Sequence, residues 1–179
     1  MRSLSTPRSA LSNFVALGFD PGLDNLGWAF VKWTPDGPEV LEAGTFVTQK
    51  DTSDLAKTRE IWDFLKGFEI YHFDLIAFEL PWARPASWVA IKLGYVAGII
   101  MAFAFCNEKA EVVKVHARYN PDALGDFDKK PTKPMVRKRI KKLFGKERGK
   151  TFHEVDAICV ALSAIVQEKK DARGTPLEG

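Results

Sequence analysis

Hydrophobic residues along the chain follow two spacings. Short, nearly continuous apolar segments bounded by turn residues are typical of buried β-strands, whereas longer stretches with an apolar residue every three or four positions are typical of amphipathic helices. The first spacing predicts strands at 14–19, 27–32, 39–47, 73–78 and 112–115. The second predicts helices at about 51–67, 85–105, 135–144 and 151–168.

Turn residues connect the first three strands closely. Asp20-Pro21-Gly22 follows the first strand, and the Pro- and Gly-containing segment 34–38 follows the second. These short connections predict a three-stranded antiparallel meander. Asp51 or Ser53 is placed to cap the first helix.

The order of elements, β-β-β-α-β-α-β-α-α, predicts one α/β domain with a five-stranded mixed sheet flanked by helices. The 179 residues suffice for a single domain of this kind. We expect the domain to span residues 14–168, with a flexible N-terminal extension at 1–13 and a charged C-terminal tail at 169–179.

Small residues recur every fourth position in the second predicted helix, at Ala90, Gly94, Gly98 and Ala102. Positions four apart lie on one helix face, so these residues form a stripe that another helix can approach closely. The approaching helix belongs either to the same chain or to a partner.

Charge is distributed unevenly along the chain. Residues 129–150 contain eleven Lys or Arg and a single acid, a local charge of +10, and the rest of the chain carries 15 basic and 22 acidic residues. A net charge of +3 therefore hides a dense basic segment. Such a segment favours a polyanionic partner, either nucleic acid or an anionic membrane surface, over a merely solvated basic helix.

Composition restricts the class of protein further. With 46% hydrophobic and 27% charged residues, the chain is neither disordered nor collagenous. The first residues lack the apolar core of a secretory signal, and the longest apolar run, 93–106, is shorter than a membrane span. Cys106 and Cys159 lie in apolar helical segments, so we expect reduced core thiols. These features predict a soluble cytoplasmic protein.

Three acids occupy positions that solvation alone does not explain. Asp20 ends the first buried strand, Glu79 ends the fourth, and Asp156 lies in the apolar stretch VDAICVALSAIV. If the first and fourth strands are neighbours, Asp20 and Glu79 emerge at one end of the sheet. The last helix would then place Asp156 over them, with His153 three residues earlier on the same face.

Crowded carboxylates raise one another's pKa, and a hard divalent cation relieves that conflict. Two Mg²⁺ ions at such a site would support phosphodiester hydrolysis. His153 would act as a ligand or transfer protons near neutral pH. Each residue also has a purely structural interpretation: Asp20 as a turn residue, Glu79 as a strand-end charge, Asp156 as a hydrogen-bonded helix acid and His153 as a capping residue.

Five segments carry a family resemblance in the same order. They are GFDPGLDNLGWAFV at 18–31, FDLIAFELPW at 73–82, KLGYVAGIIMAFA at 92–104, KPMV at 133–136 and HEVDAICVALSAI at 153–165. Together they resemble the RuvC-type Holliday junction resolvases of the ribonuclease H-like superfamily. The resemblance covers roughly residues 14–168 and implies a ribonuclease H-like fold.

The resemblance implies a catalytic metal site formed by Asp20, Glu79, His153 and Asp156, with two Mg²⁺ ions that Mn²⁺ would replace. Many members have Asp where His153 stands, which lowers the negative charge of this site. A homodimer is implied as well, because symmetric cuts in two strands need two active sites. In the family the dimer forms through the LGxxxG helix, which would place the stripe Ala90, Gly94, Gly98 and Ala102 at the interface.

DNA contacts follow from the same resemblance. Trp82 stands where the family often has an exposed aromatic residue that wedges into the junction, although it also suits a core or lid position. Lys133 matches a family lysine near the active site, and Arg118 or Lys114 matches another. We expect the basic segment to contact junction phosphates through Lys129, Lys130, Lys133, Arg137, Lys138 and Lys141.

The sequence thus predicts a Mg²⁺-dependent, structure-selective endonuclease that resolves four-way or other branched DNA. Two alternatives remain at this stage: a protein that binds branched DNA without cutting it, and a related nuclease for flaps, forks or RNA–DNA hybrids. The compact, basic chain also resembles bacteriophage-type members, which would relax its selectivity. No helicase partner can be identified from the sequence.

Overall fold

A computed structural model describes residues 14–79, 88–107, 110–115, 124–127 and 130–172. Its strands are β1 (Phe14–Asp20), β2 (Asn25–Thr34), β3 (Gly37–Val47), β4 (Leu75–Glu79) and β5 (Glu111–Val115). Its longer helices are α1 (Asp54–Lys66), α2 (Trp88–Cys106), α4 (Lys133–Phe144) and α5 (Phe152–Ala172). Both chain ends, at 1–13 and 173–179, lie outside the described residues.

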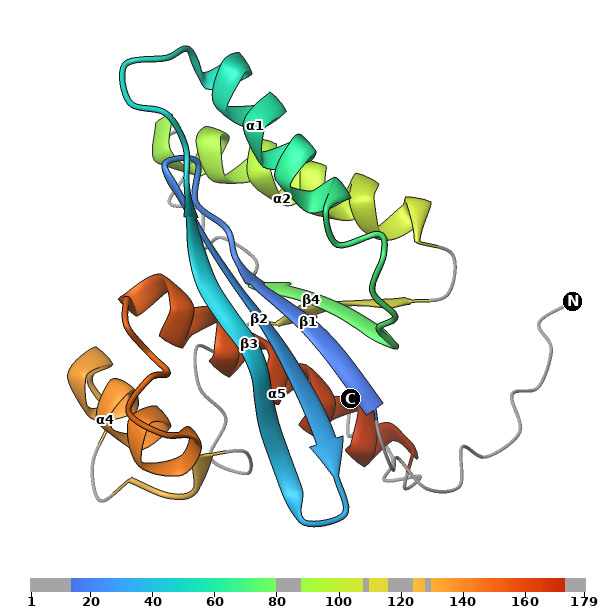
Figure 1. Ribbon diagram of the computed structural model, residues 1–179, viewed down its shortest axis with the longest axis vertical. Helices are drawn as coiled ribbons and strands as arrows, with labels where there is room; N and C mark the ends of the chain where they lie inside the picture. The colour runs from blue at the N-terminus through green and yellow to red at the C-terminus, as the bar shows by residue number, and fades with distance from the viewer. Residues whose placement is uncertain (1–13, 80–87, 108–109, 116–123, 128–129, 173–179) are drawn as a thin grey trace, which may run out of the picture.

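The five strands form one mixed sheet in the order β3-β2-β1-β4-β5 (Figure 1). β1, β2 and β3 pair antiparallel as the predicted meander, and β4 and β5 add to β1 in parallel. The predicted α/β fold with a five-stranded mixed sheet flanked by helices is confirmed. Its parallel half consists of short strands reached through helices, as parallel pairing requires.

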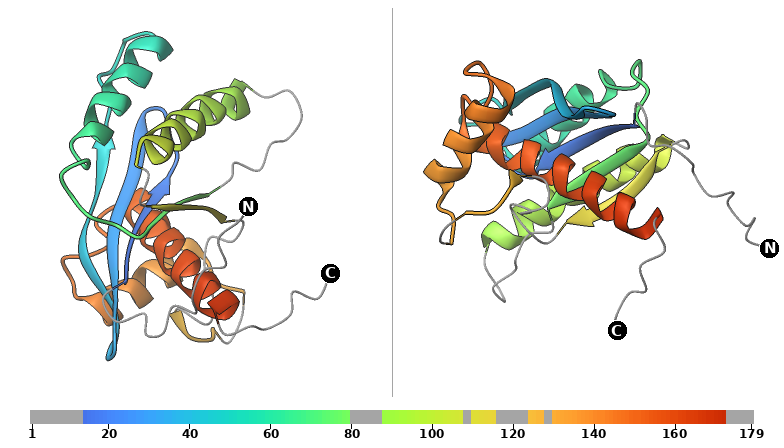
Figure 2. Two further views of the ribbon diagram at one scale, coloured as in Figure 1. Left: turned by 90° about the vertical axis from the view of Figure 1, so that its right-hand side faces the viewer. Right: turned by 90° about the horizontal axis from the view of Figure 1, so that it is seen from below.

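Helices cover both faces of the sheet, with α1 and α2 on one side and α5 with α4 on the other (Figures 1 and 2). Successive residues of β1 alternate between these layers, so Leu17 and Phe19 pack toward α1 and α2 while Ala16 packs toward α5. In β4, Ile76 and Ala77 divide between the two layers in the same way. Burial on both faces explains why these strands are continuously apolar in the sequence.

Helix boundaries differ from the predictions at two places. α4 begins at Lys133, two residues earlier than expected, because Pro134 lies in its first turn, where the missing N–H costs no hydrogen bond. α5 continues to Ala172 through a charged last turn that contains Lys169 and Lys170, which suit the negative end of the helix dipole. At α1 the predicted cap is present, since the Ser53 side chain accepts a hydrogen bond from the Ala56 amide at 3.2 Å.

Only one side of α2 lies in the core. Val96, Ile100 and Phe103 are buried, whereas Tyr95 and Phe105 are exposed. With 19 residues, α2 is long and apolar enough to span a membrane by length and composition, which the shorter apolar run of the sequence did not suggest. Five of its residues are nevertheless buried in the core of this domain.

The cysteine prediction is half right. Cys159 is buried in the core, but Cys106 is exposed, so its prediction as a core residue is wrong. Cys106 is the last residue of α2. Its neighbours Phe103 and Ala104 are buried, but Phe105 and Cys106 lie on the exposed side of the helix.

Candidate active site

Asp20 and Glu79 end two adjacent parallel strands. The register pairs Phe19 of β1 with Phe78 of β4, so the two acids come next on each strand. Strand alternation turns both of them toward the layer of α5. The predicted adjacency of the first and fourth strands is therefore correct, and it brings two carboxylates to one end of the sheet.

Two glycines let α5 lie directly on the strands. A Cβ atom on Gly18 would come within 2.6 Å of the Ala157 carbonyl oxygen, and one on Gly27 would overlap the His153 carbonyl oxygen. The first turns of α5 can approach β1 and β2 this closely only because both residues lack a side chain. This contact carries His153 and Asp156 to the end of the sheet where Asp20 and Glu79 lie.

His153 contacts Asp20 directly. Its Nδ1 lies 2.8 Å from Asp20 Oδ2, and the Asp20 side chain is only 16% exposed. The hydrogen bond to Asp20 raises the pKa of His153 above its ordinary 6.5, against the opposing effect of burial, and the charges of Asp20 and Asp156 add to the increase. The imidazole is thus held against the carboxylate in a form that favours its protonation.

Asp156 is paired with a lysine from α4. Lys133 Nζ lies 2.7 Å from Asp156 Oδ2, and the aspartate side chain is 8% exposed. Next to it, burial raises the pKa of the Cys159 thiol, and the charges of Asp156 and Glu79 raise it further. The charges of Glu79, at the end of β4, and of Asp156, on α5, therefore both act on this thiol.

The donor set suits a hard divalent cation. Asp20 and Glu79 end β1 and β4, and His153 and Asp156 lie in the first turns of α5. Carboxylate oxygens are the ligands that Mg²⁺ and Mn²⁺ prefer. Among the described residues, no three His, Cys, Asp or Glu side chains lie close enough to enclose an ion as they stand. Asp20 contacts His153 and Asp156 contacts Lys133, so both carboxylates are engaged by other side chains in this state.

The loop before α5 is fixed by a capping arrangement. Thr151 Oγ1 accepts a hydrogen bond from the Glu154 amide at 3.0 Å, and the Glu154 carboxylate accepts bonds from the amides of Gly149 at 2.7 Å and Lys150 at 2.9 Å. Glu154 is 3% exposed. Glu154 was not among the predicted functional residues, although Thr151 and Glu154 have the spacing of a capping box. Their contacts set where α5 begins and hence where His153 and Asp156 stand.

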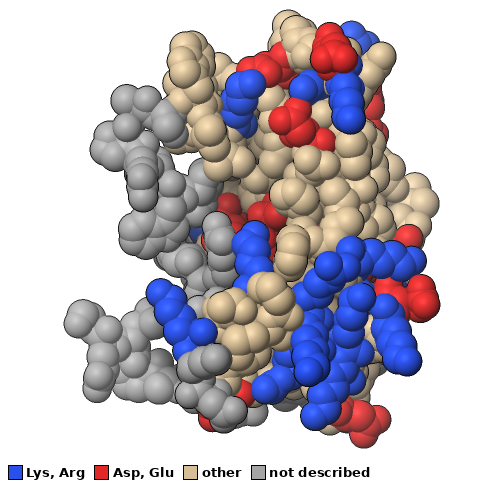
Figure 3. All heavy atoms as spheres, turned by 90° about the vertical axis from the view of Figure 1, so that its left-hand side faces the viewer, with Lys and Arg blue, Asp and Glu red and all other residues tan. Residues whose placement is uncertain are grey.

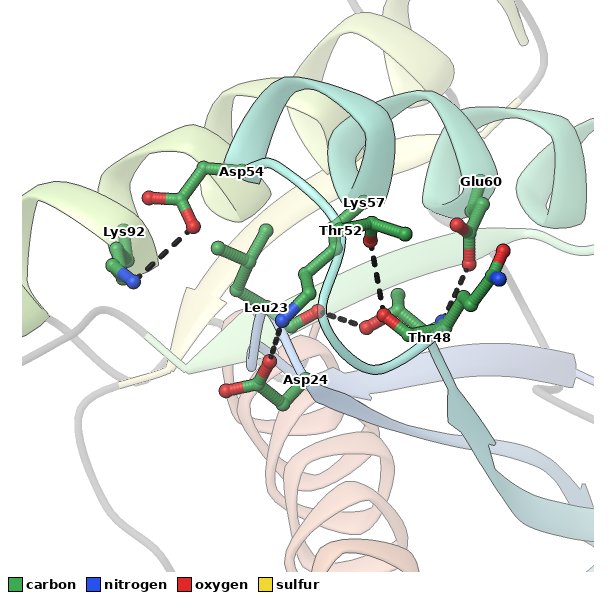
Figure 4. A network of polar contacts seen from close by, with 9 residues as sticks. Leu23, Asp24, Thr48, Thr52, Asp54, Lys57, Glu60 and Lys92 are labelled. Atoms are coloured by element: carbon green, nitrogen blue, oxygen red, sulfur yellow. Dashed lines mark hydrogen bonds and ion pairs between the residues drawn. The ribbon is translucent and has the colours of Figure 1, made fainter.

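A network of polar contacts also holds the turn that follows Asp20 (Figure 4). The Lys57 ammonium forms an ion pair with Asp24 and lowers the pKa of that carboxyl, although Asp24 is largely exposed. Thr48 donates a hydrogen bond from its hydroxyl to the Leu23 carbonyl at 3.0 Å. These contacts tie the β1–β2 turn to α1 and to the end of β3.

Residues 16–164 match the family of crossover junction endodeoxyribonuclease RuvC. The chain belongs to the RuvC family. The crossover junction endodeoxyribonuclease RuvC of Synechocystis is 27% identical over 157 residues, which cover 87% of this chain and 93% of that protein. RuvC of Granulibacter bethesdensis is 30% identical over 102 residues, or 56% of each protein.

A solved structure has the same fold as this RuvC-family chain. Thermus thermophilus RuvC, in complex with a Holliday junction substrate, superposes with a TM-score of 0.75 at 20% sequence identity, over 89% of this chain and 98% of that one. The family resemblance found in the sequence and the predicted fold are both confirmed.

The predicted DNA contacts of this RuvC-family chain fall into three groups. Trp82, Arg118 and Lys129 lie outside the described residues. Lys130 and Lys138 are exposed and Lys141 is half-buried. Lys and Arg side chains gather over the lower part of the face shown in Figure 3, and acidic side chains lie in the middle of that face, above them.

Arg137 points back into the protein. Its Nε donates a hydrogen bond to the Gly149 carbonyl at 2.7 Å, a second nitrogen donates to the Lys150 carbonyl, and the guanidinium lies 5.4 Å from the centroid of the Phe152 ring. A phosphate contact by Arg137 remains a prediction. In the structure this arginine joins α4 to the loop that starts α5.

The predicted stripe on α2 borders a groove of about 1200 Å³ between α1 and α2. Gly94, Gly98 and Ala102 line it from α2, opposite Leu55 and Trp62 of α1. A Cβ atom added at Gly94 or Gly98 would meet no other described residue within 4 Å. Close packing among the described residues therefore does not explain these two glycines.

Proposed function

We propose that this protein is a divalent-metal-dependent endonuclease that resolves four-way DNA junctions by hydrolysing phosphodiesters in opposing strands. Membership of the RuvC family, whose relatives carry the name crossover junction endodeoxyribonuclease, supports the reaction. The observation that carries the proposal is the position of Asp20 and Glu79 at the ends of two adjacent strands, with His153 of α5 in contact with Asp20. The bacterial RuvC relatives support a cytoplasmic location.

Asp20, Glu79, His153 and Asp156 would hold two Mg²⁺ ions, for which Mn²⁺ would substitute. When bound, such ions lower the pKa of an attacking water and stabilise the charge that develops on the scissile phosphate and the leaving oxygen. The protein's own part is to fix the carboxylates at the ends of two strands and one capped helix. His153 is placed to take up or release a proton beside Asp20.

The basic surface of α4 would position the DNA backbone beside this site. Lys130 and Lys138 are exposed and Lys141 is half-buried, and Lys and Arg side chains gather on the face of Figure 3 that also shows acidic side chains in its middle. Contacts to phosphates fix orientation without reading sequence, which suits an enzyme that selects a branched shape. Trp82 as a junction wedge, together with Arg118 and Lys129 as phosphate contacts, completes the proposed interface.

The decisive assay uses a synthetic four-way junction with each strand labelled in turn, in Mg²⁺. Wild type should cut two opposing strands, and Asp20→Asn and Glu79→Gln should each abolish cutting. Asp63→Asn is a matched control, because it removes one carboxylate from the exposed surface of α1. Equal cutting by wild type and both site variants would refute the site.

The same assay separates the alternatives. Junction binding in EDTA with no cleavage in Mg²⁺ or Mn²⁺ would indicate a binding protein. A panel of forks, flaps and RNA–DNA hybrids, cut faster than the four-way junction, would indicate a different branched or hybrid substrate.

We further propose that two copies associate through the groove between α1 and α2. Trp88, Val89 and Ile91, at the start of α2, and Tyr95, which lines the groove, are exposed, and exposed apolar area of this kind is typical of an interface. A symmetric pair would place two active sites on one junction. Sedimentation should show a dimer for wild type and a folded monomer for Gly98→Leu, whose Cβ would meet no other described residue within 4 Å and whose side chain would obstruct a partner helix. A Gly98→Leu dimer as tight as that of wild type would contradict this interface.

A further inference from the structure

Lys133 neutralises a nearly buried acid of the proposed metal site. Its Nζ lies 2.7 Å from Asp156 Oδ2, with the aspartate side chain 8% exposed and the lysine side chain 45% exposed. A carboxylate taken out of water is unfavourable without a counter-charge. In this state the counter-charge is an ammonium group of the protein itself.

A divalent ion would compete with this ammonium for the same carboxylate. Asp156 is a proposed ligand, and both cations seek the negative charge of its oxygens. Lys133 has a flexible four-carbon stem with a half-exposed side chain, so it can leave without disturbing the core. Binding of the ion therefore carries the cost of breaking the Lys133–Asp156 pair.

The released ammonium would lie at the border of the basic surface. Lys133 is the first residue of α4, the helix that also presents Lys138 and Lys141. Once separated from Asp156, its positive charge would be available to a DNA phosphate at the edge of the site. As long as it is paired with Asp156, that charge contributes little to DNA binding.

We propose that Lys133 exchanges partners during assembly of the active complex: it is bound to Asp156 in the free protein and to a backbone phosphate once a divalent ion has taken Asp156. The proposal rests on the proposed function and deepens it, because it links DNA binding to metal binding at one side chain. By thermodynamic linkage, bound DNA raises the affinity of the protein for the ion by the same factor by which the bound ion raises its affinity for DNA. If the paired form outweighs the released form by about ten to one, Lys133 contributes a factor of roughly ten to this coupling.

The test measures junction affinity by fluorescence anisotropy in EDTA and in Ca²⁺ at matched ionic strength, with junction integrity checked on a gel. Lys133→Met should weaken binding little in EDTA and roughly tenfold more in Ca²⁺. Lys138→Met, on the exposed side of the same helix, should weaken binding by the same factor in both conditions. Lys133→Arg keeps the charge and should retain most of the difference between the two conditions.

A second measurement needs no DNA. In calorimetric titrations with Ca²⁺, Lys133→Met should bind the ion more tightly than wild type, and Lys138→Met should match wild type. Equal losses in EDTA and Ca²⁺ for Lys133→Met would make Lys133 an ordinary phosphate contact and overturn the exchange. A wild type that neither binds nor cuts junctions would instead refute the proposed function, while the titrations would still decide whether Lys133 competes with the ion.

Discussion

Glu154 allows the placement of the active-site helix to be tested separately from catalysis. Its carboxylate is 3% exposed and accepts hydrogen bonds from the amides of Gly149 and Lys150. Glu154→Ala removes the acceptor and leaves the buried Gly149 amide without it. Hydrogen bonds to a charged group contribute about 1.5–3 kcal/mol each, and an unsatisfied buried donor costs about 1–3 kcal/mol.

We expect Glu154→Ala to lower the free energy of unfolding by about 3 kcal/mol, because the two bonds are partly replaced by water at Lys150 but not at Gly149. For a chain of this size that corresponds to a fall in Tm of roughly 6–12 °C. Glu154→Gln keeps one acceptor oxygen but turns an amide group toward a backbone donor, so about 1–2 kcal/mol should be lost.

Urea unfolding of the metal-free protein measures these differences. Glu147→Ala is the matched control, since Glu147 lies in the same loop with a side chain that is 89% exposed, and its change should stay within about 0.5 kcal/mol. If Glu154→Ala is as stable as Glu147→Ala, the carboxylate does not cap α5 in solution. In that case Glu154 does not set the start of α5 or the positions of His153 and Asp156.

Three further predictions concern single side chains. Gly27→Ala should destabilise the protein by about 1–3 kcal/mol in urea unfolding, because its Cβ would overlap the His153 carbonyl oxygen, whereas Gly94→Ala, which has open space, should not. Because the pKa of His153 is raised in the folded state, its contact with Asp20 stabilises the metal-free protein below about pH 6.5 and loses this effect as the pH rises through the raised pKa. The stability difference between wild type and His153→Gln should therefore shrink from pH 5.5 to pH 9, and a constant difference would contradict the contact. In thiol labelling with a disulfide reagent, exposed Cys106 should react in the native protein and buried Cys159 only after unfolding, so two reactive native thiols would contradict the packing.

Local patterns were sufficient for the elements of this fold. The continuous apolar runs of β1 and β4 predicted strands buried on both faces, and Ser53 predicted the start of α1. Pro134 was misinterpreted as part of a loop, because proline breaks a helix interior yet is accepted in a first turn. Cys106 was misplaced because an apolar neighbourhood in the sequence does not tell which side of a helix the chain covers.

The sequence alone also identified the acids of the candidate site. Asp20, Glu79 and Asp156 interrupt apolar segments, where burying a charge is unfavourable unless it is paired or binds a metal. The sequence could not show what each acid contacts. The Lys133–Asp156 pair, the His153–Asp20 contact and the inward turn of Arg137 join residues from different elements, and each depends on which neighbours the fold places within reach.

The range of an interaction along the chain decides whether the sequence alone can predict it. Strand and helix preferences, caps and burial patterns arise from residues a few positions apart, so the sequence by itself determined the elements, their order and the charged positions worth examining. Sheet order, the close approach of α5 at Gly18 and Gly27, and the choice of ion-pair partner arise from competition among groups distant in the chain. Only the tertiary structure decided that Lys133, expected near the active site as a phosphate contact, forms an ion pair with Asp156.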